Sequence, residues 1–186
     1  MFGRIDIVLA NAGVAGLPAV PTLEIDESRW QDVIDINLTG VWKTIKAAVP
    51  HVIRGGRGGA VIITSSMTAV KAVENAAAYA SAKGGLTALM RGLALELAPH
   101  SIRVNTVHTT TVSTRMVHND VMYSLFRPEL EHVTREDFYE AAQTLHRLPV
   151  PEIEPVDVSN AIAFLASAEG RYITGQQLII DAGACL

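Results

Sequence analysis

The sequence predicts an α/β protein in which helices cover a parallel β-sheet. Short apolar, β-branched runs alternate with longer segments of helical periodicity, and the connections between successive runs are long enough for crossovers. Neither an internal repeat nor a low-complexity linker divides the chain, so we expect residues 1–186 to form a single domain.

The elements follow from the apolar pattern and from the residues that interrupt it. The first strand reads as a run buried on both faces, and the glycines of Gly55–Gly59 stop the first helix. The expected elements are, in order, a strand at Ile5–Ala10, a helix at Ser28–Arg54, a strand at Ala60–Thr64, a helix at Ala76–Leu97, a strand at Ile102–Val107, helices at Arg135–His146 and Asp157–Ser167, and a strand at Gln177–Asp181.

Composition narrows the possible functions. The formal net charge of −4 gives no reason to expect nucleic acid or an anionic membrane as a partner, and no apolar stretch approaches the ~18 residues of a membrane span. Cys185 is the single cysteine, so the chain forms no internal disulfide, and we expect a reducing, cytoplasmic location. The six histidines lack helical His-x-x-x-His spacing, so no metal site is expected.

Tyr79 and Lys83 give the strongest functional signal. Residues four apart lie on one face of a helix, and a nearby ammonium favours the phenolate, so we expect the pKa of Tyr79 to fall below its usual value of about 10. Ser66, at the end of the preceding strand, can hydrogen-bond the same substrate oxygen. Such a set is suited to reducing a carbonyl or oxidising an alcohol when a hydride carrier is bound.

The expected strand ends converge on one edge of the sheet. Open α/β sheets bind ligands beyond the carboxyl ends of their strands, where Asn11-Ala12-Gly13 and Ser66 fall. The glycine-rich turn Gly55–Gly59 reads as a phosphate loop or as a plain turn, and the plain turn is favoured because a strand follows it. For the apolar loop Leu17–Pro21, substrate contact and loop packing both stay open.

Several motifs together resemble the short-chain dehydrogenase/reductase family. Asn11-Ala12-Gly13, Asn37, Ser66, Tyr79 and Lys83 stand in that family's order and spacing, and the resemblance covers the whole chain. It implies a Rossmann-like doubly wound parallel sheet of strand order 3-2-1-4-5-6-7, seen here from the fourth strand onward, with about four strands. Tail motifs resemble the carveol-dehydrogenase-like, mycofactocin-associated subgroup, among them Phe126-Arg127-Pro128, Leu148-Pro149-Val150-Pro151 and Tyr172-Ile173-Thr174-Gly175.

The resemblance also implies roles for individual residues. Tyr79 becomes the catalytic acid/base, Lys83 lowers its pKa and holds the nicotinamide ribose, Ser66 orients the substrate oxygen, and Asn37 holds a water that relays protons. From the residues alone, Asn37 reads instead as a cap or kink between helices. The residues implied to bind the cofactor are Asn11, Ala12 and Gly13 on the adenosine side, Tyr79 and Lys83, and Val112 and Thr114 at the carboxamide.

The implied cofactor is NAD, with NADP left open, and the implied substrates are small, often terpenoid, alcohols or ketones. Members of the family pair the helices equivalent to Ser28–Arg54 and Ala76–Leu97 with those of a second copy, so a homodimer or homotetramer is expected.

The chain departs from the family pattern in three places. The family's opening strand and its pyrophosphate-binding glycine-rich turn have no counterpart, so the strand at Ile5–Ala10 is expected to form a sheet edge with exposed apolar surface. Thr109-Thr110 replaces Pro-Gly, and Ala69 stands where glycine is usual. Two hypotheses therefore stay open: an oxidoreductase whose coding sequence begins upstream of Met1, or a truncated, catalytically inactive fragment that only oligomerises.

Overall fold

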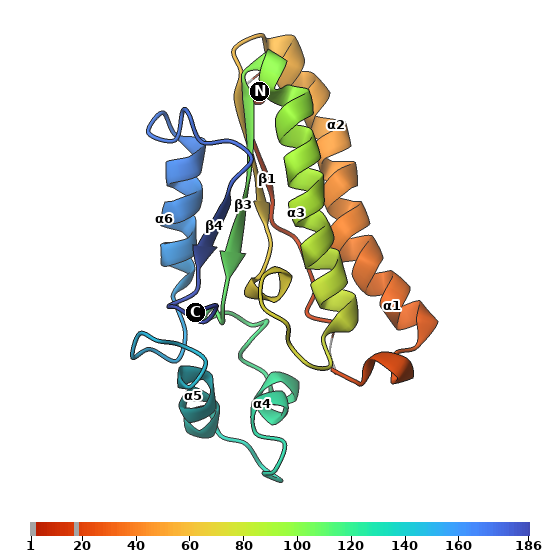
Figure 1. The fold of residues 1–186 in the computed structure, drawn as a ribbon, viewed down its shortest axis with the longest axis vertical. Helices are drawn as coiled ribbons and strands as arrows, with labels where there is room; N and C mark the ends of the chain where they lie inside the picture. Colours follow the sequence, from red (N-terminus) through yellow and green to blue (C-terminus); the bar gives the residue numbers. More distant parts are fainter. Residues whose placement is uncertain (1–2, 17–18) are drawn as a thin grey trace.

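The computed structural model describes residues 3–16 and 19–186, and so leaves Leu17 and Pro18 of the apolar loop outside the described residues (Figure 1). The strands β1 (Ile7–Ala10), β2 (Gly59–Thr64), β3 (Ile102–Thr109) and β4 (Gln177–Ile180) form one sheet in the order β1-β2-β3-β4. All neighbouring strands pair in parallel. The α/β class and the expectation of about four strands are confirmed.

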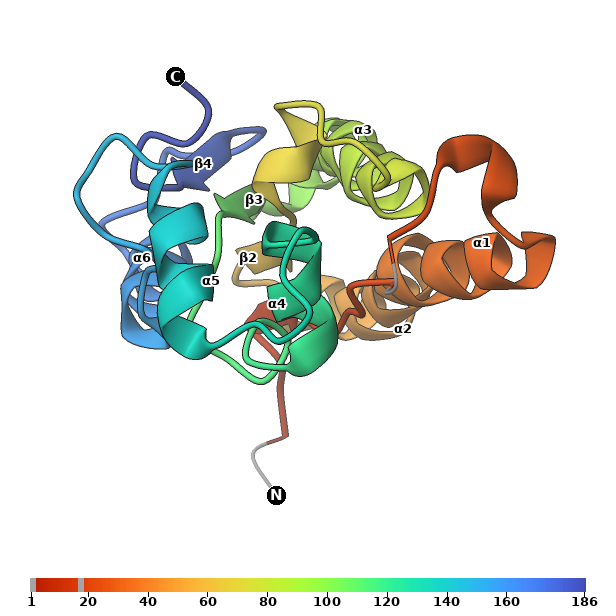
Figure 2. The ribbon, with the colours of Figure 1, turned by 90° about the horizontal axis from the view of Figure 1, so that it is seen from below.

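Helices lie on both faces of the sheet. The helices α2 (Gly40–Gly55) and α3 (Ala77–Leu97) cover one face, α6 (Pro155–Ala166) covers the other, and α1 (Glu27–Ile34) extends beyond α2 (Figure 1). The shorter α4 (Asp120–Phe126) and α5 (Arg135–Gln143) lie across the carboxyl ends of the strands (Figure 2). The sequence did not predict α4, and the helix expected to reach His146 ends at Gln143. Within the described residues, no helix is long and apolar enough to cross a bilayer.

The layers follow from the periodicity of the sequence. Along α3, buried residues recur almost every fourth position, so one stripe of the helix packs on the sheet. The opposite face is filled by Ile62, Val107 and Leu165, the last from α6. The central strand β2 is therefore buried on both faces, as its continuous apolar run predicts.

The edge strand β1 differs from its prediction. Val8 and Ala10 are buried, whereas Ile7 is 53% and Leu9 44% exposed, so burial on both faces was wrong. The reason is that α2 packs on one face of β1, whereas α6, on the other face of the sheet, packs on β2 and β3. The expected exposure of apolar side chains at this edge of the sheet is confirmed.

The helix expected over Ser28–Arg54 is interrupted. After α1 ends at Ile34, a π-helical turn runs over Asp35–Thr39, and the N–H of Gly40 donates to the carbonyl of Asp35. A π-helical turn inserts one residue and is frequent at functional sites. Here it carries Asn37, which is completely buried.

Candidate active site

Tyr79 and Lys83 lie one turn apart at the start of α3, with Nζ of Lys83 5.6 Å from the centre of the Tyr79 ring. The Lys83 ammonium is buried and donates a hydrogen bond to the carbonyl of Thr64 over 3.0 Å. In return, Oγ of Ser65 donates to the carbonyl of Lys83 over 3.1 Å. The start of α3 is thus fixed against the end of β2, which brings the predicted tyrosine and lysine to the carboxyl edge of the sheet.

Ser66 follows directly after this strand end. Its side chain caps a short 3-10 turn by accepting from the N–H of Thr68 over 3.2 Å. Burial raises the pKa of Tyr79, and a hydrogen bond with the Ser66 side chain opposes that rise. The Ser66 side chain is thus close enough to the phenol to affect the pKa of Tyr79, as their spacing predicts.

The expected fall in the pKa of Tyr79 is not found. Burial of the phenol outweighs the hydrogen bond from Ser66, so the pKa lies above its usual value. Burial also lowers the pKa of Lys83 to about 8, and its ammonium is turned toward the carbonyl of Thr64. Sequence spacing alone gives no measure of this desolvation.

Asn37 holds the loop after β1 close to Lys83. Its amide accepts from the N–H of Val14 over 3.1 Å and donates to the carbonyl of Val14 over 3.0 Å. A Cβ added at Gly13 would lie 2.6 Å from Oδ1 of Asn37 and 3.4 Å from Nζ of Lys83, so this close approach requires glycine. Asn37 lies in the π-helical turn that separates α1 from α2, as the kink interpretation expects, and its amide keeps one N–H and one lone pair free of Val14. The water relay stays a prediction.

The residues predicted to contact the cofactor lie around this edge. Asn11 and Ala12 are exposed at the end of β1, and Oδ1 of Asn11 accepts from the Thr64 hydroxyl over 2.8 Å. Val112 and Thr114 lie on the loop after β3, where Val112 forms a parallel bridge with Ile153. The structure brings three strand ends and the start of α3 to one edge, with the Val112–Thr114 loop beside them.

The Gly55–Gly59 turn lies elsewhere. It joins the end of α2 to the start of β2, at the amino ends of the strands and so opposite Tyr79 (Figure 1). Gly56 has φ +69° and ends α2, which is the C-cap role that favours glycine. The plain-turn interpretation fits this position.

A cavity of about 620 Å³ opens beside the catalytic candidates. Gly13 and Val14 line it from the loop after β1, Arg29 from α1, and Met116 and Asn119 from the loop after β3. Ser66 and Tyr79 do not line it. It touches the site at Gly13, where Asn37 and Lys83 approach most closely.

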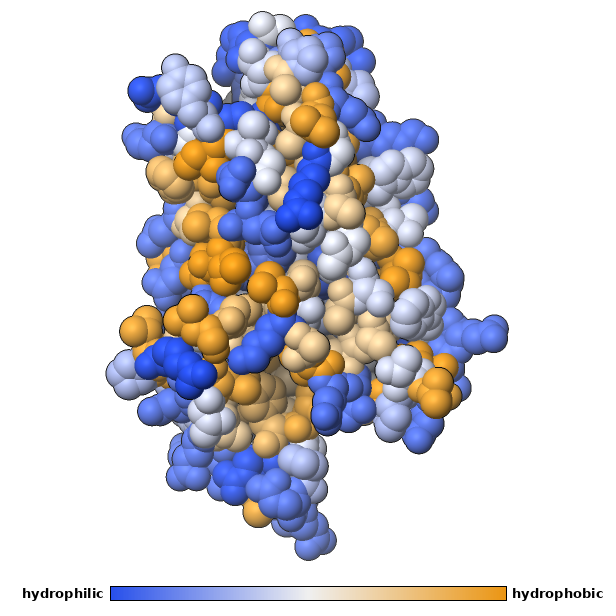
Figure 3. Space-filling view, in the orientation of Figure 1, coloured by the Kyte–Doolittle hydropathy of each residue, from blue (hydrophilic) through white to orange (hydrophobic). Residues whose placement is uncertain are grey.

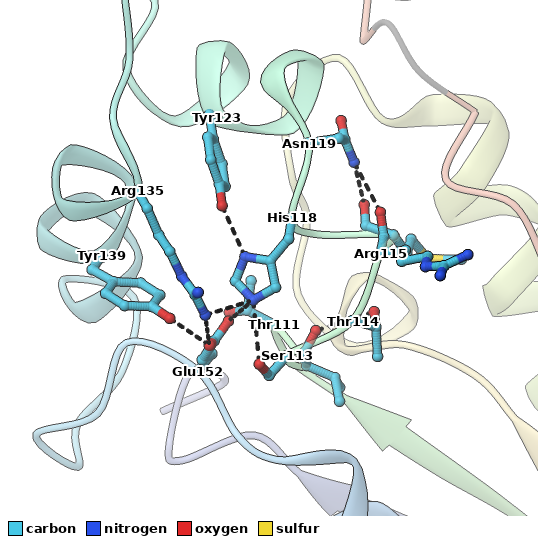
Figure 4. Close-up of polar contacts among 12 residues, drawn as sticks. Thr111, Ser113, Thr114, Arg115, His118, Asn119, Tyr123, Arg135, Tyr139 and Glu152 are labelled. Carbon is cyan, nitrogen blue, oxygen red and sulfur yellow. Dashed lines mark hydrogen bonds and ion pairs between the residues drawn. The ribbon is translucent and has the colours of Figure 1, made fainter.

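A polar cluster holds the loop after β3 from the other side (Figure 4). The Glu152 side chain is 7% exposed, accepts from the Tyr139 hydroxyl over 2.9 Å and lies 3.1 Å from Nε2 of His118. Nε2 of His118 is also 3.2 Å from Oγ of Ser113, whose N–H donates to the carbonyl of Ile153. Sequence reasoning missed this cluster because its members come from separate segments with no motif spacing.

This arrangement can exchange a proton with a substrate oxygen. It offers a phenol, a second hydroxyl and a buried ammonium, but these side chains supply no hydride. A redox reaction here requires a hydride-carrying cofactor such as a nicotinamide. Asn11 and Ala12 are exposed at the end of β1, so this edge of the sheet is open to such a group.

Comparison with known proteins gives consistent results. Residues 1–185 match the family described as enoyl-(acyl carrier protein) reductase. The chain is 51% identical to (-)-trans-carveol dehydrogenase of Rhodococcus erythropolis over 99% of its length, and 50% identical to a putative short-chain type dehydrogenase/reductase of Mycolicibacterium smegmatis. In both cases it spans 66% of the relative, just under two thirds.

Solved structures agree. The crystal structure of carveol dehydrogenase from Mycobacterium avium in complex with NAD superposes with a TM-score of 0.96 at 53% identity, covering 98% of this chain and 65% of that one. A short-chain dehydrogenase from Mycobacterium paratuberculosis bound to NAD follows at a TM-score of 0.86 and 37% identity. With the Ser66–Tyr79–Lys83 arrangement and the parallel sheet, these matches show that the chain belongs to the short-chain dehydrogenase/reductase family.

Proposed function

We propose that the protein is an NAD-dependent dehydrogenase that interconverts a small secondary alcohol of terpenoid type and its ketone. The observation that carries the proposal is the placement of Ser66 and Tyr79 at one edge of the sheet, with the buried Lys83 5.6 Å from the centre of the Tyr79 ring. Relatives named for carveol and isopiperitenol oxidation, from Rhodococcus erythropolis and Mentha piperita, support the substrate class.

The residues divide the work in the oxidation direction. A bound NAD would supply the acceptor for the hydride that leaves the alcohol carbon. The phenolate form of Tyr79 takes the hydroxyl proton, while Ser66 donates a hydrogen bond to the same oxygen. Lys83 provides positive charge beside the phenol, and Asn37 holds the loop that keeps Gly13 close to Lys83. Asn11, Ala12, Val112 and Thr114 are proposed to complete the cofactor site.

We also propose a homodimer or homotetramer in the cytoplasm. Trp42 of α2 and Leu95 of α3 are 43% and 79% exposed, and hydrophobic residues lie over α3 in Figure 3. Such a surface suits a symmetric interface. The unpaired Cys185 supports a reducing compartment. Light scattering on the purified protein tests the assembly, and a monomer at micromolar concentration would contradict it.

Activity is tested by following NADH absorbance with the purified protein, NAD and a panel of carveol, isopiperitenol and cyclohexanol. The matched control is Tyr79→Phe, which keeps the ring and removes the proton acceptor. We expect turnover to fall by ~10² or more, the usual contribution of a positioned acid/base, with little change in NAD affinity. Activity retained by the Phe variant would refute the role of Tyr79.

A second candidate is a protein that oligomerises without catalysis. A dinucleotide cofactor needs a site for its pyrophosphate, which a glycine-rich turn commonly supplies. Within residues 3–16 and 19–186, the turn richest in glycine is Gly55–Gly59, and it lies at the opposite end of the sheet from Tyr79. Calorimetric titration with NAD and NADP, on protein of verified intact mass, separates the two. Micromolar NAD binding supports the dehydrogenase, and no binding supports the second candidate.

A further inference from the structure

We propose that His108 is a positioning residue, which holds the backbone of Ser66 so that the Ser66 hydroxyl meets Tyr79. The inference rests on the proposed dehydrogenase function for its catalytic consequence. Its structural part, a fixed imidazole tautomer bonded to Ser66, stands independently of that function.

The geometry places His108 beside the backbone of Ser66. Its ring is completely buried near the end of β3, with Nδ1 3.0 Å from the carbonyl oxygen of Ser66 and Nε2 2.9 Å from Oγ1 of Thr106. The sheet ladder stops one residue earlier, where the N–H of Ser65 donates to the carbonyl of Val107. Beyond that point, His108 is the link from β3 to the catalytic serine.

The partners fix the tautomer. A carbonyl oxygen accepts but cannot donate, so Nδ1 of His108 must carry the proton that bonds to Ser66. Nε2 of the neutral ring is then an acceptor, and the hydroxyl of Thr106 can donate to it. Both ring nitrogens are satisfied within the buried site, which holds the imidazole plane in one orientation.

The surroundings keep the ring neutral. Burial lowers the pKa of His108, the bond to the Ser66 carbonyl opposes that change, and the nearby charge of Lys83 lowers the pKa further. A neutral N–H donor holds Ser66 without placing a second full positive charge next to Lys83. A lysine or arginine at this position would add that charge.

His146 provides a matched comparison within the same chain. It is also buried, with Nδ1 2.6 Å from the carbonyl of Val150 and Nε2 2.7 Å from Oγ1 of Thr110. The two histidines make the same kinds of contact, but only His108 bonds to Ser66. A role in packing alone predicts similar consequences when either ring is removed.

The first test compares His108→Leu with His108→Asn, whose Nδ2–H lies near the former Nδ1–H and can still reach the Ser66 carbonyl. We expect the leucine variant to lose about tenfold to a hundredfold in kcat, the range found when a group that orients a metal ligand is removed, with KM for NAD nearly unchanged. The asparagine variant should recover most of that loss. Equal activity in wild type and the leucine variant, or no recovery with asparagine, would overturn the proposal.

The pH profile separates positioning from packing. The hydrogen bond with Ser66 lowers the pKa of Tyr79. If Ser66 is displaced, the part of the kcat/KM pH profile that reports titration of the Tyr79–Lys83 pair should therefore move to higher pH. His108→Leu should show this movement, whereas His146→Leu should lose comparable stability and keep that part of the profile in place. The same movement in both variants would assign His108 to packing and refute its positioning role.

A third test measures the tautomer of His108 and does not require the protein to be active. Two-dimensional ¹H–¹⁵N spectra of the imidazoles distinguish Nδ1–H from Nε2–H, and we expect Nδ1–H for His108 in the wild-type protein. An Nε2–H or doubly protonated ring would overturn the proposal even if the enzyme is active. A protein that has the Nδ1–H tautomer but oxidises no alcohol would instead refute the proposed function while leaving the His108–Ser66 bond established.

Discussion

Replacing Lys83 with methionine should stabilise the fold at neutral pH while it abolishes activity. Lys83 is 4% exposed, and burial lowers its pKa from 10.5 to about 8. The ammonium form is therefore less favourable in the folded protein than in the unfolded chain. Methionine has a similar length and shape and carries no charge, so it should fill the same space without that penalty.

The expected change in the free energy of unfolding follows from the lowered pKa of Lys83. Each pKa unit corresponds to 1.36 kcal/mol, so the buried ammonium costs about 3 kcal/mol at pH 7. The substitution also removes the hydrogen bond from Nζ to the carbonyl of Thr64, which offsets about 1–2 kcal/mol of the gain. We expect Lys83→Met to raise the free energy of unfolding by about 1–2 kcal/mol at pH 7.

The dependence on pH gives the decisive assay. Above pH 8 the folded protein releases the Lys83 proton while the unfolded chain still binds it, so the wild type should gain stability as pH rises from 8 toward 10.5. The variant lacks this group, and its advantage should shrink by about 2 kcal/mol between pH 7 and 9.5. Urea denaturation of both proteins measures the difference. A stability difference that stays constant over this range would refute the buried-ammonium argument.

Three further substitutions test other contacts. Asn37→Ala removes both hydrogen bonds to Val14 and should lower the free energy of unfolding by about 1–3 kcal/mol in urea melts; no loss would mean that the loop holds itself. Gly13→Ala should weaken NAD binding, because its Cβ would lie 2.6 Å from Oδ1 of Asn37, and unchanged calorimetric affinity would contradict this. Glu152→Gln keeps an acceptor for Tyr139 but removes the buried charge, so amide exchange in α5 should quicken; unchanged exchange would show that the charge is dispensable.

Local periodicity predicted most of the fold but not its interruptions. The stripe of buried residues on α3 and the apolar run of β2 are visible in the sequence, and both elements were found close to their expected bounds. The break between α1 and α2 is not visible in the sequence, because helical periodicity continues through it. The contact made there, between Asn37 and Val14, joins residues 23 positions apart. The short α4 was missed although Asn119 caps it, because seven residues show too little periodicity.

The site was predictable in its membership and not in its electrostatics. Four-residue spacing placed Tyr79 beside Lys83, and parallel strand order placed Ser66 at the same edge. The direction of the Tyr79 pKa depends on burial, which is a property of packing rather than of spacing, and there the sequence argument was wrong. His108 and Glu152 gave no motif signal, because their partners are backbone carbonyls and side chains from distant segments.

The end of β2 is held by side chains from two different neighbours. Lys83 of α3 bonds to the carbonyl of Thr64, and His108 of β3 bonds to the carbonyl of Ser66, two residues further along. Beyond the sheet ladder, these two bonds act together with the N–H groups of Thr68 and Ala69, which donate to the hydroxyl and the carbonyl of Ser66. A charged donor on the helix side and a neutral donor on the strand side fix the backbone while leaving one positive charge for the phenol. The placement of Ser66 beside Tyr79 thus accounts for two of the polar side chains that this mostly aliphatic core buries, Lys83 and His108.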